Sequence, residues 1–163
     1  ITSFMNPESD SSESGYQLRQ SLISIGNGGV LGLQGNAITK ENSVGYAAQY
    51  VPEVQTDFIF ASIAEQWGFL GACFLLLLYG ILISRMIAIA RTAKDQFGSI
   101  ICVGLVAYFL FALLQNIGMT IGLMPITGIT LPLISYGGTS LLTTVMSIGL
   151  ILNVGMRRKK IYF

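Results

Sequence analysis

Three long runs of apolar residues, separated by more polar segments, dominate the pattern of this chain. The first covers about residues 58–84 with Glu65 as its only charged residue, and the second (about 99–123) and third (about 138–154) contain no charge. A helix rises 1.5 Å per residue, so about 20 apolar residues cross the roughly 30 Å core of a bilayer. The runs predict three transmembrane helices, the third only just long enough. The alternative, buried helices of a soluble protein, rarely supplies three uncharged runs in succession.

Basic residues mark the ends of these spans. Arg85, Arg91 and Lys94 lie between the first two spans, and a second cluster, Arg157–Lys160, follows the third. Loops rich in Lys and Arg remain on the cytoplasmic side of a membrane. Three spans with both basic ends inside place the start of the chain, and the loop before the last span, on the outer side.

The predicted fold is an all-α integral membrane protein whose three spans belong to a larger polytopic bundle. Residues 1–56, polar and glycine-rich, form an extracytoplasmic loop region with at most a short helix near 16–24. Residues 57–163 form the membrane domain and end in the cytoplasmic basic tail 157–163. The apolar loop 124–137 is broken by proline and glycine, so we expect it to be re-entrant and to line a cleft, unless it is a plain interfacial turn.

The composition agrees with a membrane protein, because 52% of the residues are hydrophobic and only 10% are charged, against about 25% charged in soluble domains. A net charge of +1 argues against a nucleic-acid partner. The absence of histidine excludes His-based catalysis and most zinc sites. Cys73 and Cys102 lie in apolar runs without metal-ligand spacing and are expected to be structural. Because the chain opens with Ile1, we expect it to be part of a longer protein.

Two carboxylates stand at the entry to the first span. If a helix starts at Pro52, where proline is favoured, Glu53 and Asp57 are four residues apart and stack on one face. Their mutual repulsion and partial burial would favour proton uptake by one of them near neutral pH, as in a general base. Helix capping by Thr56 or Asp57 is the alternative, and the local pattern alone favours it.

Three polar side chains lie within the predicted spans. Glu65, inside a lipid-spanning helix, is expected to face protein or water. Gln115 and Asn116 are expected to form interhelical hydrogen bonds rather than a substrate site.

Several short motifs in series resemble one protein family. The matching segments are Pro52–Phe60, Glu65 with Gly68–Gly71, Asn116–Met119, Gly122–Gly128, and Pro132 with Ile134–Gly138. In order and over nearly the whole chain they resemble the SEDS proteins, for shape, elongation, division and sporulation, which include RodA and FtsW. The resemblance implies a many-helix glycosyltransferase of the bacterial cytoplasmic membrane. Such an enzyme polymerises lipid II into peptidoglycan glycan strands beside a class B penicillin-binding protein.

The resemblance also implies roles for individual residues. Asp57 corresponds to the essential aspartate of the Thr-Asp-Phe motif and would act as the general base on the acceptor sugar. Lys40, by position the loop lysine of the family, would meet the substrate diphosphate, and Glu53 and Ser135 would line the same cleft. A divalent cation on that diphosphate is compatible with the family, although the sequence shows no dedicated set of metal ligands.

The chain departs from the family pattern in three places. Gln55 stands where the family usually has histidine, and the segment 38–50 is longer than usual. The 163 residues contain no counterpart of the amino-terminal helices that complete the family's cavity, so we expect these residues alone to be inactive. Two other functions stay open: a lipid or solute transporter, because broken apolar loops and intramembrane acids also fit translocation, and a non-catalytic division scaffold.

Overall fold

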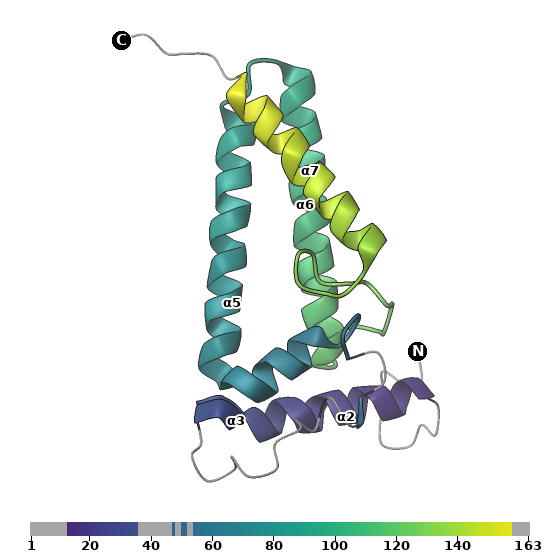
Figure 1. Cartoon of the computed structure of the whole chain (residues 1–163). Helices are drawn as coiled ribbons and strands as arrows, with labels where there is room; N and C mark the ends of the chain where they lie inside the picture. Colours follow the sequence, from purple (N-terminus) through teal and green to yellow (C-terminus); the bar gives the residue numbers. More distant parts are fainter. Residues whose placement is uncertain (1–12, 36–46, 48–49, 52–53, 158–163) are drawn as a thin grey trace.

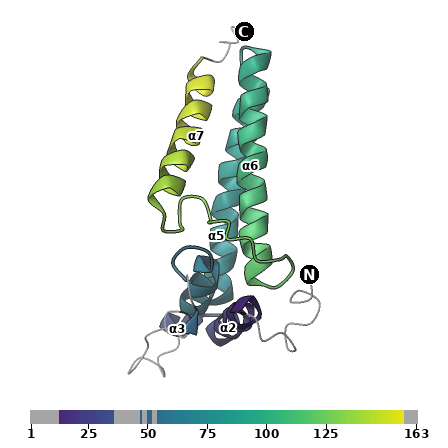
Figure 2. The ribbon, with the colours of Figure 1, turned by 90° about the vertical axis from the view of Figure 1, so that its right-hand side faces the viewer.

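The computed structural model describes residues 13–35, 47, 50–51 and 54–157, and the regular secondary structure in these ranges is all helical. The helices are α2 (Glu13–Gly28), α3 (Gly32–Gly35), α5 (Ile59–Arg91), α6 (Gln96–Thr120) and α7 (Gly138–Met156). The long helices α5, α6 and α7 pack against one another, and α2 lies across one end of the group (Figure 1). Figure 2 shows α2 nearly end-on beneath α5 and α6. The predicted all-α fold is confirmed.

Three helices of the described chain, α5, α6 and α7, are long and apolar enough to cross a membrane, which confirms the predicted number of spans. Their bounds differ from the prediction mainly in α5, which continues past Arg85 to Arg91. The extension follows from packing, because Met86 and Ala90 are buried in a core cluster with side chains of α6 and α7.

α5 bends sharply at Gly68, which the apolar pattern did not predict. Gly68 has φ 69° and ψ −167°, a backbone conformation open essentially only to glycine. A short arm, residues 59–67, runs alongside α2, and a long arm, residues 69–91, turns away from it (Figure 1). The long arm extends roughly 34 Å, enough to cross a bilayer core alone. Glu65 therefore lies in the short arm before the bend. We had expected it inside the membrane-spanning helix, and that expectation is wrong.

The bend interrupts the helical hydrogen-bond ladder, and the chain after α2 supplies the missing acceptors. Phe69 N donates to Gly29 O at 2.9 Å, and Leu70 N donates to Val30 O at 3.2 Å. Unpaired amides are costly where water is excluded. The two bonds therefore satisfy the first N–H groups of the long arm and join it to the end of α2.

Glycines let the α2 and α3 backbones approach α5 very closely. An added Cβ at Gly28 would lie 2.1 Å from Ala64 O, and one at Gly32 would lie 2.2 Å from Gln66 O. The glycine-rich stretch that we interpreted as loop chemistry, with a short helix near 16–24, is in fact a longer helix. Gly28 of this helix lies at the contact with α5, whereas Gly26 faces open space.

Small polar side chains complete the contact between α2 and the rest of the bundle. Ser21 and Ser24 are fully buried, and Leu18 is nearly so. Ser21 Oγ donates to Thr120 O at the end of α6 at 2.9 Å. These residues recur at intervals of three, so one stripe of α2 packs on α5 and α6.

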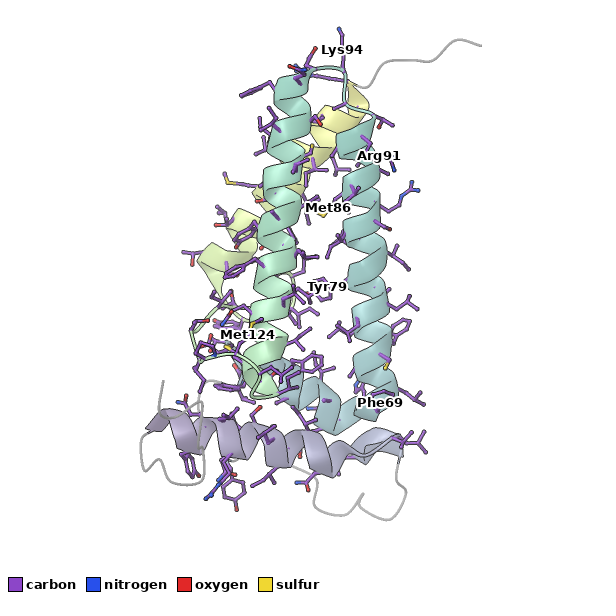
Figure 3. The ribbon with its side chains drawn as sticks, turned by 180° about the vertical axis from the view of Figure 1, so that it is seen from behind. Phe69, Tyr79, Met86, Arg91, Lys94 and Met124 are labelled. Carbon is purple, nitrogen blue, oxygen red and sulfur yellow. The ribbon has the colours of Figure 1, made fainter. Side chains whose placement is uncertain are left out.

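Basic residues lie at the end of the three helices opposite α2. Arg91 and Lys94 lie at the turn between α5 and α6, far from α2 (Figure 3). The last turn of α7 reaches the same end, since an added Cβ at Gly98 would lie 3.2 Å from Val154 Cγ1, and Arg157 is the C-cap of α7. Arg91, Lys94 and Arg157 therefore lie at one end of the bundle, and the other members of the second basic cluster, residues 158–160, lie outside the described residues.

The loop between α6 and α7, residues 121–137, folds back along α6. Leu123 N and Met124 N both donate to Gly118 O, at 2.7 and 3.0 Å. Figure 3 shows Met124 beside the end of α6. This is the re-entrant-like loop that the sequence predicts.

The bend in α5 can be tested by Gly68→Ala in the full-length protein. An added Cβ would lie 2.3 Å from Gly32 N, at a positive φ. We expect a loss of at least about 2 kcal/mol in the free energy of unfolding, from backbone strain and overlap together. Thermal unfolding in detergent would measure it.

Gly80→Ala is the matched control, because Gly80 lies in the same helix and an added Cβ there meets nothing within 4 Å. It should leave the unfolding temperature unchanged or slightly raised. Equal effects of the two substitutions would contradict the bend.

Candidate active site

Asp57 lies in a turn directly before α5. Residues 54–57 form this turn, and Phe58, whose side chain makes no capping hydrogen bond, is the N-cap of α5. The prediction of a helix that starts at Pro52 and carries Asp57 on its face is therefore wrong. The alternative, in which Thr56 or Asp57 is the N-cap of this helix, is also wrong, because the N-cap of α5 is Phe58.

Hydrogen bonds from distant segments hold this turn. Tyr136 N, at the end of the loop 121–137, donates to Gln55 O at 2.8 Å. Asn116 Nδ2, from α6, donates to Asp57 O at 2.9 Å. Two main-chain carbonyls of the turn are thus bound to the rest of the fold. Local sequence cannot reveal such bonds, which explains why the local pattern mispredicted a helix here.

The Asp57 side chain is half-buried and lies against the loop at Gly128. An added Cβ at Gly128 would lie 3.3 Å from Asp57 Oδ2, and Gly128 has φ +66°. Glycine therefore serves two purposes here: it permits the left-handed backbone, and it leaves room for the carboxylate.

Asn116 connects the two segments that meet at the carboxylate. Besides its bond to Asp57 O, its Nδ2 donates to Ile129 O at 2.7 Å, so both amide hydrogens are used by main-chain carbonyls. The side chain is fully buried. Its Oδ1 has no hydrogen-bond partner in the described part of the chain.

Gln115, the preceding residue, binds the same loop nearer its start. Its Nε2 donates to Pro125 O and to Thr127 Oγ1, both at 3.0 Å. The expected interhelical bonds of Gln115 and Asn116 are instead bonds to the loop and to the turn before α5.

Ser135, predicted to line the substrate cleft, is nearly buried in the structure. Its Oγ accepts a hydrogen bond from Leu131 N at 2.8 Å, and its own N–H donates to Leu131 O at 3.0 Å. Tyr79 of α5 donates its hydroxyl to Pro132 O. Ser135 therefore braces the loop two residues beyond Leu133, whose φ of 70° is unusual for a residue with a side chain.

Glu65 anchors the chain that leads to Asp57. The side chain is 1% exposed, and its Oε2 accepts a hydrogen bond from Ala47 N at 2.7 Å. Ala47 packs with Val51 and Phe58 in a small core cluster beside the turn. Glu65 thus faces protein, as expected of it, although outside the spanning arm.

Lys40 and Glu53, two other predicted site residues, lie outside the described residues. Among those that are described, no three His, Cys, Asp or Glu side chains gather as a metal site. A cation on the substrate therefore remains only an implication of the resemblance.

The arrangement presents a carboxylate on a main chain fixed from two sides, at the end of the bundle where α2 lies. A carboxylate so held can take a proton from a hydroxyl without first having to be ordered. Asn116 and Gly128 are the neighbours that local reasoning missed. In the sequence, Asn116 could have been noticed as an uncharged polar residue inside an apolar run. The only signal for Gly128 was that it lies in a loop interrupted by proline and glycine.

Known proteins similar to this chain agree on one family. The family model described as a cell cycle protein, for FtsW, RodA and SpoVE, matches residues 1–160. Stage V sporulation protein E of Bacillus subtilis is 44% identical over 157 residues, which are 94% of this chain and 40% of that protein. The peptidoglycan glycosyltransferase RodA of Treponema pallidum is 38% identical over 155 residues, 95% of this chain and 35% of that protein.

Solved structures share the fold. A peptidoglycan synthase complex, studied for the coordination of polymerization and crosslinking, contains a chain that matches with a TM-score of 0.78 and 31% identity, over 98% of this chain and 41% of that one. An aspartate-to-alanine mutant of the rod shape determining protein RodA from Thermus thermophilus matches with a TM-score of 0.61 and 40% identity, over 65% and 36%. The chain spans about two fifths of the length of its curated relatives.

Proposed function

Because this chain belongs to the FtsW, RodA and SpoVE family of cell cycle proteins, the SEDS family, we propose that it is the catalytic part of a peptidoglycan glycosyltransferase. The longer protein would polymerise lipid II into glycan strands in the bacterial cytoplasmic membrane. The observation that carries the proposal is the match over nearly the whole chain to relatives named as peptidoglycan glycosyltransferases. The three apolar helices agree with a multi-pass membrane protein.

In the proposed reaction Asp57 is the general base. The 4-hydroxyl oxygen of the acceptor sugar attacks the anomeric carbon of the donor, and its proton passes to the Asp57 carboxylate. The bond from that carbon to the lipid diphosphate breaks, and its electron pair leaves with the diphosphate. A diphosphate leaves without being protonated, so one carboxylate suffices, unlike the pair that glycoside hydrolysis uses.

The geometry around Asp57 supports this role. The Asp57 side chain is half-buried, and its carboxylate lies against Gly128, which leaves room for it. The main-chain carbonyl of Asp57 accepts a hydrogen bond from Asn116. A base held in place before substrate arrives loses less to reorganisation during the reaction. We further propose that Lys40 and Glu53 contact the substrate and that Ser135 acts by bracing the cleft wall. A divalent cation on the diphosphate would add charge compensation.

We propose that the end carrying α2 and Asp57 faces outward. Support comes from Arg91, Lys94 and Arg157, which lie at the opposite end, because clusters of Lys and Arg are typical of cytoplasmic loops; α2 carries a single basic residue, Arg19. On that face the enzyme would work with a class B penicillin-binding protein, which crosslinks the new strands. A solved relative belongs to a peptidoglycan synthase complex, which agrees with such a partner.

Asp57→Asn in the full-length protein tests the general base. Because asparagine cannot accept the proton, the rate of lipid II polymerisation should fall by about 10²- to 10⁴-fold. Gel analysis of labelled glycan strands measures the rate. Asp95→Asn, at the opposite end before α6, is the control and should polymerise normally.

Other outcomes would identify a different function. Equal rates for the wild type and Asp57→Asn would remove the general-base role. Flipping of labelled lipid II without polymer, unchanged by Asp57→Asn, would favour a transporter. Growth restored by Asp57→Ala in cells lacking the protein would favour a scaffold.

Cysteine labelling in intact cells tests the orientation. In full-length protein with Cys73 and Cys102 changed to serine, Gln55→Cys should react with a membrane-impermeant maleimide, because this exposed position would face outward. Lys94→Cys, exposed at the other end, should react only after the cells are permeabilised. The reverse pattern would exclude the proposed site, since the lipid-linked sugar could not reach it.

The 163-residue chain by itself should make no polymer from lipid II. It spans about two fifths of its curated relatives, so most of the wall around a substrate would be missing. The same gel assay with purified chain in detergent checks this, with full-length protein as the positive control. Polymer from the short chain would show that these residues suffice.

A further inference from the structure

We propose that Asn116 is a positioning residue, which sets where the Asp57 carboxylate stands by holding main chain on both sides of the contact at Gly128. This inference rests on the proposed function. Asn116 does not touch the reacting atoms in this proposal, and it acts only through the two segments that it binds.

The two bonds of Asn116 reach the two segments whose contact forms the site. One carbonyl belongs to Asp57 itself, and the other belongs to Ile129, the neighbour of Gly128. These partners lie 59 and 13 residues away along the chain. The carboxamide is planar and its two hydrogens point in fixed directions, so one side chain sets the separation of two segments that share no local structure.

The position of the carboxylate depends directly on that separation. Asp57 Oδ2 is already within 3.3 Å of the place a Cβ would occupy at Gly128. A small approach of the segments would therefore press the carboxylate onto the loop, and a small separation would let it rotate away. Either displacement would move the base from its place beside a bound hydroxyl.

The unpaired oxygen of Asn116 argues that the residue is kept for position rather than for stability. Oδ1 is buried without a partner in the described chain, and most buried polar atoms in native proteins are hydrogen-bonded. A fully buried apolar side chain would avoid that desolvation, but it could not bind two carbonyls.

Gln115 offers a matched comparison within the same turn of α6. Like Asn116, it is buried and donates two hydrogen bonds, but both go to the loop and neither reaches the turn that carries Asp57. Gln115 thus holds only the loop, whereas Asn116 holds both the loop and the turn. The bond from Tyr136 N to Gln55 O does not involve Asn116, so we expect the turn to shift rather than detach when Asn116 is changed.

The test compares Asn116→Leu and Gln115→Leu in the full-length protein, with lipid II as the substrate. We expect Asn116→Leu to lower kcat by about 10- to 100-fold, since a misplacement of about 1 Å can cost this much. KM should stay within about twofold of the wild type, because the substrate contacts remain. Gln115→Leu should keep kcat within about threefold of the wild type. Thermal unfolding of both variants separates this effect from loss of fold.

Asn116→Asp serves if Asn116→Leu does not fold, because it keeps the shape and removes the amide donors. A wild-type kcat in folded Asn116→Leu or Asn116→Asp would overturn the positioning role, as would an equal loss of kcat in Gln115→Leu.

If the wild-type protein makes no polymer, or Asp57→Asn polymerises normally, the proposed function fails and this inference fails with it. A positioning role that fails alone leaves the Asp57→Asn effect intact.

Discussion

The amide groups released at the bend of α5 must be bound by other parts of the chain, and the architecture at this end of the bundle depends on that requirement. Phe69 and Leu70 donate to the carbonyls that follow α2, so the bend and α2 hold each other in place. The short arm of α5 then lies along α2 with backbones in near contact. The turn that carries Asp57 is the direct extension of this arm. Its position therefore follows from the bend.

Buried amides make the second set of connections in this region. Along α6, side chains of Gln115 and Asn116 bind a loop that has no regular structure of its own. Apolar packing alone fixes such a loop poorly, because dispersion contacts have little directional preference. The bonds of Gln115 hold the start of the loop at Pro125 and Thr127, and the bond of Asn116 to Ile129 O holds the part in which Gly128 faces the carboxylate.

The three membrane-length helices could be predicted, because long uncharged runs have few other stable arrangements, whereas their orientation in the membrane remains a prediction. The bend at Gly68 could not, since Gly-Phe-Leu-Gly inside an apolar run fits a continuous helix equally well. α2 was mostly interpreted as a loop because its serines and glycines interrupt an apolar face, although Leu18 and Ile25 pack with them on the same side of the bundle. Asp57 was identified through the family resemblance, whereas its turn and its link to Asn116 depend on residues 59 positions away. Lys40 and Glu53 remain predictions.

The bonds between the end of α2 and the long arm of α5 also constrain how the protein is made. Gly29 and Val30 leave the ribosome roughly 40 residues before Phe69 and Leu70, and domains form progressively during synthesis. The two carbonyls therefore cannot form their bonds to α5 until the donors have been synthesised. The contact between the end of α2 and the long arm of α5 therefore forms only after both segments have been made, although α2 is synthesised first.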